Sequence, residues 1–131
     1  MNKPDGCFLV KASIKDGSFF KKWLIFSKPF HMLTDREIDV ASLFLKKRYE
    51  LSKAISDQDI VDRMVMDTNT RKQILEECGL KAPHLQIILS KMKKCGMLTQ
   101  DNRINHRFIP NIKNDSKSFN LLLYFDLNDS K

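Results

Sequence analysis

The first part of the chain has the pattern of a β-hairpin. Residues 7–12 are mostly apolar, and a turn signal follows at Asp16-Gly17. Six of the 12 aromatic residues lie within the first 30 positions, and aromatic residues favour strands. We therefore expect an N-terminal aromatic β-hairpin over about residues 7–28, in which residues 7–12 pair with residues 22–27.

The middle of the chain changes to helical spacing. Thr34 and Glu37 have the spacing of a capping box, in which each side chain satisfies a backbone N–H of the other. The apolar residues that follow recur every three or four positions, which predicts a helix over residues 35–51. A second cap, Ser56 with Asp59, predicts the start of a shorter helix.

Two further helices follow in close succession. The pattern predicts a helix over residues 70–78, ended by Gly79, and another over residues 83–95, ended by Gly96. A glycine just past a helix is a common C-terminal signal. Pro83 suits the first turn of the second helix, where a missing backbone N–H costs nothing.

The remaining segments predict strands. Residues 97–100 and 103–109 have the pattern of two strands joined by a turn, and the nearly continuous apolar run over 119–126 predicts a buried strand. A length of 131 residues suits one domain. We therefore expect a single α+β domain over residues 1–131.

Residues 79–98 read G-L-K-A-P-H-L-Q-I-I-L-S-K-M-K-K-C-G-M-L. This run resembles the winged helix-turn-helix family of bacterial and phage regulators, whose motif is G-L-[ST]-x-x-T-V-S-x-x-L-x-x-L-x-x-x-G-[LI]-[LI]. The resemblance spans about residues 70–109, roughly 40 of the 131 residues, and the matching positions are mostly those that pack. It implies a winged helix-turn-helix fold, to which the N-terminal hairpin and the C-terminal strand are additions.

The resemblance also implies a DNA-binding surface. In that family, the second helix of the motif enters the major groove, and the wing contacts the DNA backbone or the minor groove. Carried over by position, the implied nucleic-acid-binding residues are Arg71, Lys72, Lys81, His84, Gln86, Ser90, Lys91, Lys93, Lys94, Arg103, Asn105 and Arg107. Lysine and arginine at these positions would neutralise phosphates and release counterions.

The sequence departs from the family motif where specificity would be expected. Lys81 stands where serine or threonine is usual, and Ile87 occupies a groove-facing position that often carries arginine. Only Gln86 and His84 can make hydrogen bonds that read bases. Ile87 has two other interpretations: it packs against the wing or another helix, or it is an apolar anchor for a partner subunit.

The net charge of +7 is unevenly distributed. Residues 70–110 carry eight basic and three acidic residues, a net charge of +5, whereas residues 35–69 carry six basic and eight acidic residues, a net charge of −2. A basic block on one structural unit favours a polyanion or an acidic protein as partner. A solvated surface with no partner is the alternative interpretation.

Catalytic chemistry finds little support in the sequence. The three cysteines and three histidines are scattered, their spacing matches no zinc motif, and the chain has only four glycines for a phosphate loop. We expect reduced thiols, no catalytic residues, no metal, no cofactor and no enzyme activity. We also expect no membrane partner and a cytoplasmic location, because no apolar run approaches the ~20 residues of a membrane span.

The sequence therefore favours a non-catalytic nucleic-acid-binding protein, such as a bacterial or phage transcription regulator, with double-stranded DNA as its partner. The alternative is a structural subunit of a phage virion or connector, which would use the same helices for contacts with assembly proteins or with a second copy. Lysine outnumbers arginine 17 to 6, as in proteins of AT-rich genomes, including many phages. In a phage-encoded protein the location would be the host cytoplasm or the virion.

Overall fold

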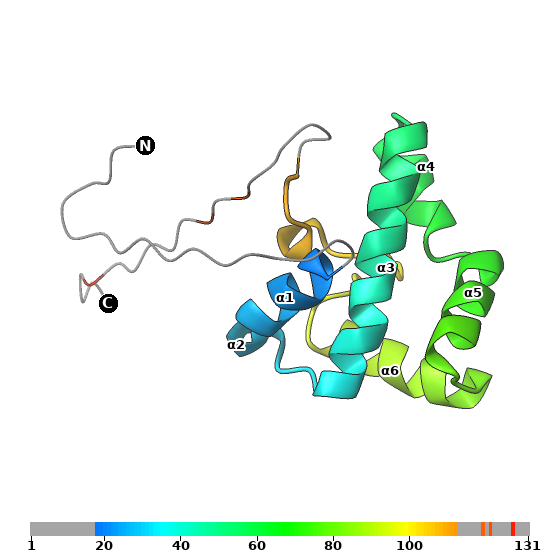
Figure 1. The fold of residues 1–131 in the computed structure, drawn as a ribbon, viewed down its shortest axis with the longest axis horizontal. Helices are drawn as coiled ribbons and strands as arrows, with labels where there is room; N and C mark the ends of the chain where they lie inside the picture. The colour runs from blue at the N-terminus through cyan, green and yellow to red at the C-terminus, as the bar shows by residue number, and fades with distance from the viewer. Residues whose placement is uncertain (1–17, 113–118, 120, 122–126, 128–131) are drawn as a thin grey trace.

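The computed structural model describes residues 18–112, together with Phe119, Leu121 and Leu127, and it is helical (Figure 1). The helices are α1 (Phe19–Phe26), α2 (Lys28–His31), α3 (Asp35–Ala54), α4 (Gln58–Met64), α5 (Thr68–Cys78) and α6 (Ala82–Lys94), followed by the 3-10 helix η1 (His106–Phe108). Within these residues there is no β-strand. One isolated antiparallel bridge joins Leu98 to Ile104.

The predicted α+β class is therefore wrong. Residues 22–27, expected as the second strand of the N-terminal hairpin, belong mainly to α1. Phe20 and Leu24 are buried four residues apart, so they lie on one side of a helix and pack into the core together. Such tertiary packing overrides the preference of aromatic residues for strands. The first predicted strand, residues 7–12, lies outside the described residues.

The predicted C-terminal strand over residues 119–126 also lies almost entirely outside the described residues. Only Phe119 and Leu121 are described, and neither is in a strand. The Phe119 ring lies 5.2 Å from the Phe19 ring and 5.8 Å from the Trp23 ring, both in edge-to-face geometry. Phe119 thus contacts α1 through its aromatic ring.

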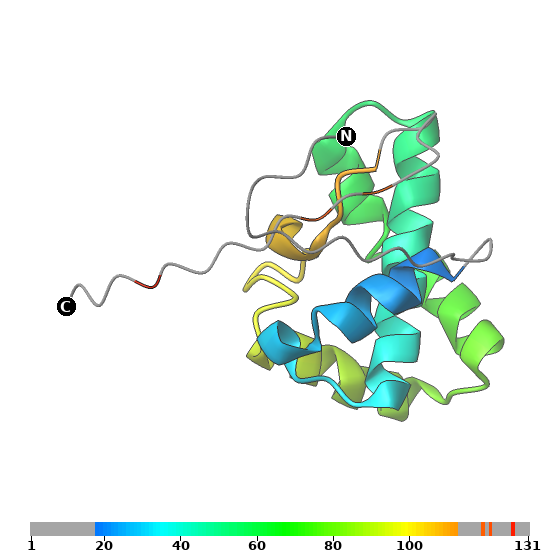
Figure 2. The ribbon, with the colours of Figure 1, turned by 60° about the vertical axis from the view of Figure 1, so that its left-hand side comes forward.

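Helix α3 is the centre of the fold: it contacts α1, α4, α5 and α6, and these helices surround it in both views (Figures 1 and 2). Its capping box forms as predicted, since Thr34 Oγ1 accepts from Glu37 N at 3.3 Å and Glu37 Oε1 accepts from Thr34 N at 2.8 Å. The cap of α4 differs from the prediction. Asp57, not Ser56, is the N-cap residue, and its carboxylate accepts from Asp59 N at 3.0 Å.

The two strands predicted after α6 are also absent. The chain makes a short loop that folds back on itself instead. Two backbone hydrogen bonds close it, from Thr99 N to Arg103 O and from Asn105 N to Met97 O, each at 2.7 Å. The loop ends at Asn105 because its side chain accepts from Arg107 N and caps η1. We call residues 97–105 the closed loop.

One hydrophobic cluster includes residues of α1, α3, α5, α6, the closed loop and η1. Its most deeply buried large side chains include Phe44, Leu24, Ile38, Ile74, Leu85, Ile88, Met92, Met97 and Ile104. The shared cluster fixes α6 and the closed loop relative to α3. None of the helices in the described part of the chain combines the length and apolar character needed to cross a bilayer.

Candidate nucleic-acid interface

Helices α5 and α6 form a helix–turn–helix unit with a three-residue connection, residues 79–81. Gly79 ends α5 in the left-handed conformation, with φ of 64°, as the sequence predicted. Leu80 N donates to Leu75 O at 3.0 Å, which closes the end of the helix. Pro83 lies in the first turn of α6, also as predicted. The signals of Gly79 and Pro83 were therefore interpreted correctly, whereas α5 begins at Thr68, before its predicted start at residue 70, because the Asp67 carboxylate caps it by accepting from Thr70 N at 2.8 Å.

The buried side of α6 determines which of its residues face solvent. Leu85, Ile88, Leu89 and Met92 are buried, and they lie on the side of α6 that meets the core. The exposed part of α6 carries five members of the set expected to contact DNA, namely His84, Gln86, Ser90, Lys91 and Lys94. Exposed residues from the predicted set are Lys72, Lys81, His84, Gln86, Ser90, Lys91, Lys94 and Arg107.

Six of these exposed residues make no side-chain hydrogen bond or ion pair within the described part of the chain: Lys72, Lys81, His84, Gln86, Ser90 and Lys94. Helix α6 has no acidic residue, so no carboxylate on the same helix competes with a bound anion for the basic side chains. We call the five of these residues that lie on α6 or at its N-cap (Lys81, His84, Gln86, Ser90 and Lys94), together with Ile87, the α6 face; Lys72 lies on α5. Lys93, at the edge of the same helix, is partly buried.

Lys91 has an intramolecular partner. Its Nζ lies 2.8 Å from Glu37 Oε2, and the Glu37 side chain is only 8% exposed. Burial alone would raise the pKa of Glu37, but hydrogen bonds from Lys91 and Thr34 outweigh it and hold that pKa below its usual range. This ion pair ties α6 to the first turn of α3. Lys91 thus orients the helix instead of presenting a free ammonium group.

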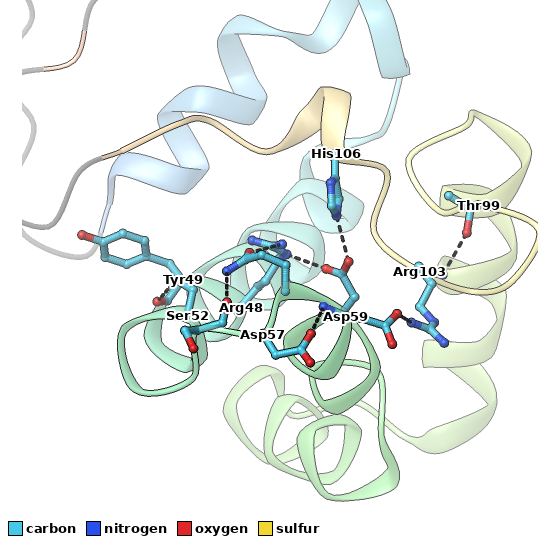
Figure 3. Close-up of polar contacts among 11 residues, drawn as sticks. Arg48, Tyr49, Ser52, Asp57, Asp59, Thr99, Arg103 and His106 are labelled. Carbon is cyan, nitrogen blue, oxygen red and sulfur yellow. Dashed lines mark hydrogen bonds and ion pairs between the residues drawn. The ribbon is translucent and has the colours of Figure 1, made fainter.

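Two predicted wing residues are also used within the protein. Arg103 is partly buried, and its Nη1 lies 3.3 Å from Asp59 Oδ1 (Figure 3). Asn105 donates from Nδ2 to Gly96 O at 2.9 Å. These contacts join the closed loop to α4 and to the end of α6.

The two remaining arginines of the predicted set differ in exposure. Arg107 is exposed, and its guanidinium lies 5.6 Å from the centre of the Phe108 ring. Arg71 is partly buried at the start of α5, and its buried Nε has no hydrogen-bond partner among the described residues. Neither residue lies on α6, so each would extend the surface beyond that helix.

A cluster that the sequence did not reveal lies beside η1. Arg48 Nε donates to Asp62 Oδ1 at 2.9 Å, and His106 Nε2 lies 2.8 Å from Asp62 Oδ2 (Figure 3). Arg48 Nη2 also donates to Gln58 at 2.9 Å. The side chains of Arg48 and Asp62 are 8% and 11% exposed, so the pair is largely desolvated. This cluster fixes η1 to α3 and α4.

Ion pairs join the acidic block of the sequence, residues 35–69, to the basic block, residues 70–110. Glu37 and Asp59, from the acidic block, pair with Lys91 and Arg103, from the basic block. Helical periodicity places Lys91 at the side of the exposed face of α6, which is where a partner on a neighbouring helix could be expected. Nothing local in the sequence points to the Arg103 pair, which joins residues 44 positions apart.

The described residues contain neither a group of metal ligands nor an activated thiol. No group of three or more His, Cys, Asp or Glu side chains there could hold a metal ion. Cys78 and Cys95 are free thiols, and burial raises the pKa of Cys78 above its usual value. A raised pKa makes a thiol a poorer nucleophile at neutral pH.

No family model, curated protein or solved structure matches this chain. The resemblance to the winged helix-turn-helix family therefore stays a prediction from residues 70–109.

Proposed function

We propose that this chain is a non-catalytic protein that binds double-stranded DNA through the α6 face. The observation that carries the proposal is an exposed helix face, after a helix–turn–helix connection, with basic and hydrogen-bonding side chains and no carboxylate. The side chains that face solvent there have no partner within the described residues. Such a face provides positive charge without an internal anion to neutralise it.

The arrangement suits a helix that lies in the major groove. The N-terminal half of α6 carries His84 and Gln86, which can hydrogen-bond to base edges. Lys72 and Lys81 lie on α5 and in the connection, and Lys93 and Lys94 lie at the C-terminal end of α6. Basic side chains at both ends of a groove-bound helix can contact phosphates on either side of it.

A bacterial or phage transcription regulator is the role that we propose for such a protein.

A second candidate function, a subunit of a larger assembly, is favoured by a different observation. Four large apolar side chains on α1, α2 and the residue after α2 are exposed, namely Ile25, Phe26, Phe30 and Met32, with 46 to 74% of their surface accessible. Exposed apolar patches often mark contacts with another protein. This patch lies on elements that the proposed DNA contact does not use.

The proposal is tested by the salt dependence of DNA binding. Fluorescence anisotropy of a labelled random-sequence duplex is measured from about 50 to 200 mM salt. If Lys72, Lys81, Lys93 and Lys94 each neutralise one phosphate, the slope of log K against log salt is about −3.6, and affinity falls roughly a hundredfold over this range. We expect Lys81→Glu with Lys94→Glu to weaken binding to all sequences.

The matched control is Lys53→Glu. Lys53 lies in the last turn of α3, 16 residues after Glu37, which is about 24 Å along a helix. It is exposed, so the same charge reversal there should leave the affinity unchanged; because Lys53 Nζ lies 4.5 Å from the centre of the Tyr49 ring, folding of this variant is checked by circular dichroism. Absence of duplex binding at the lowest salt, or equal weakening by Lys53→Glu and the double variant, would overturn the proposed function.

A further inference from the structure

The most unusual residue of the α6 face is an exposed isoleucine. Ile87 has 59% of its surface accessible, whereas the apolar residues before and after it, Leu85 and Ile88, are 2% exposed. Successive residues of an α-helix are rotated by about 100°, so Ile87 lies roughly opposite the buried row. Pro83, Ser90 and Lys94 share its side of the helix, at spacings of four, three and seven residues. Ile87 is therefore at the centre of the surface that a partner would meet.

The surroundings of Ile87 are basic. An open depression of about 640 Å³ is lined by Ile87, Ser90, Lys91, Lys93, Lys94 and Gln100. Three of these residues are lysines, and because Lys91 is paired with Glu37, Lys93 and Lys94 supply the available positive charge. None of the lining residues is acidic, and Ile87 is the only large apolar side chain among them. An occupant with complementary chemistry must carry negative charge and offer a small apolar group near its centre.

The major groove of DNA has this combination. Phosphates line both edges, and the C5-methyl group of thymine is the apolar group on its floor. Gln86, the neighbour of Ile87, is exposed, and its amide makes no hydrogen bond within the described residues. A glutamine amide can bind the N6 and N7 atoms of adenine in a bidentate manner. Gln86 and Ile87 project about 100° apart around α6, so they suit neighbouring positions of an A·T-rich site, Gln86 at an adenine and Ile87 at a thymine methyl group.

We infer that the α6 face recognises A·T base pairs, with Ile87 in contact with thymine methyl groups and Gln86 hydrogen-bonded to adenine. This inference rests on the proposed function and adds the class of sequence that the protein binds. It gives the apolar residue at the centre of a basic surface a direct role, and it requires no partner other than DNA.

The test removes the methyl group alone. Binding is measured by anisotropy for an A·T-rich duplex, for the same duplex with deoxyuridine in place of every thymidine, and for a G·C-rich duplex of equal length. Burial of one methyl-sized group corresponds to about a fourfold change in affinity. We expect wild-type protein to bind the thymidine duplex at least fourfold more tightly than the deoxyuridine duplex, and the G·C-rich duplex more weakly still.

Substitutions assign the effect to the side chain. Ile87→Ala should bind the thymidine and deoxyuridine duplexes equally, because the group that contacts the methyl is gone. Ile25→Ala makes the same substitution at an exposed isoleucine of α1, outside the α6 face, and as the matched control should keep the preference for thymidine. Gln86→Ala should lose the preference for A·T over G·C and retain the sensitivity to the methyl group. The three variants replace exposed side chains, and their folding is checked by circular dichroism.

The outcomes separate the two proposals. No binding to any of the three duplexes would overturn the proposed function and this inference with it. Binding of wild type to the thymidine and deoxyuridine duplexes with equal affinity would overturn the inference and leave the proposed function standing. A thymidine preference that Ile87→Ala retains would also overturn it, since the methyl group would then act through DNA shape.

Discussion

Substitution of Lys91 by methionine tests whether this residue orients α6 or contacts the partner. Methionine keeps most of the apolar stem but removes the ammonium group, which leaves the buried Glu37 carboxylate with its hydrogen bonds from Thr34, including the backbone N–H at 2.8 Å. A hydrogen bond to a charged group contributes about 1.5–3 kcal/mol. Because Lys91 is 54% exposed and water screens the pair, we expect a loss of about 1–1.5 kcal/mol at neutral pH.

The stabilisation that the Lys91–Glu37 pair provides depends on pH. The pKa of Glu37 is lower in the folded protein than in the unfolded chain, so the ionised group stabilises the fold above the unfolded value of about 4.3. That contribution is lost as the pH falls through the lowered value. The difference in unfolding free energy between wild type and Lys91→Met should therefore be largest at neutral pH and shrink below about pH 4.

The assay is urea denaturation followed by circular dichroism across this pH range, with Lys94→Met as the control, since Lys94 is exposed and has no partner among the described residues. In DNA binding, Lys94→Met should reduce the salt slope by about one, and Lys91→Met should change it less. Equal stability of the two variants at pH 7 would refute a structural role for the Lys91–Glu37 pair.

Three further predictions concern the core. Leu89→Ala should destabilise the protein by about 2–5 kcal/mol in urea denaturation, whereas Ile87→Ala should change stability by less than about 0.5 kcal/mol. Asp62→Asn leaves a buried guanidinium without its counter-ion and should cost about 3–5 kcal/mol, against under about 1 kcal/mol for His106→Gln at an exposed ring; similar values for the two would contradict the burial argument. Burial lowers the pKa of His31, so unfolded protein takes up protons first as the pH falls below about 6.5, and stability drops there. His31→Gln should flatten this part of the stability curve measured by thermal unfolding.

The helix–turn–helix unit could be predicted because its signals are local. Gly79 takes a left-handed conformation that few other residues accept, Pro83 fits a first turn, and the buried positions of α6 recur at helical spacing. The capping box of α3 is local as well. Each of these features depends on residues within about one turn of each other, so the sequence alone contains the necessary information.

The segments that were wrong depend on contacts of two kinds. Residues 19–26 have strand-like composition, but Phe20 and Leu24 are buried against a core that α3 dominates, and no window of local sequence contains those partners. The predicted returning strand stops at Asn105 through nearer contacts, because its side chain bonds to Gly96, nine residues earlier, and caps η1 by accepting from Arg107 N.

The candidate site was predictable only in part, for the same reason. Which side of α6 is exposed follows from periodicity, so Lys81, Gln86 and Lys94 were placed correctly on the exposed surface. Whether a basic side chain is available is decided by acidic residues elsewhere in the chain. Lys91 and Arg103 pair with carboxylates 54 and 44 residues away, and a net charge counts such lysines and arginines as free.

The hydrogen bond from Trp23 Nε1 to Phe108 O, 2.7 Å long, spans 85 residues of sequence and joins α1 to η1 just after the closed loop. Trp23 is the only tryptophan in the chain. Tryptophan fluorescence therefore comes from this side chain alone, and the wavelength of its emission maximum depends on whether the indole keeps this partner or faces water. Trp23 is thus an intrinsic fluorescent reporter of how η1 docks on α1. In a titration with unlabelled DNA, a shifted emission maximum is expected if binding moves η1 away from the indole, and an unchanged spectrum is expected if η1 keeps its place.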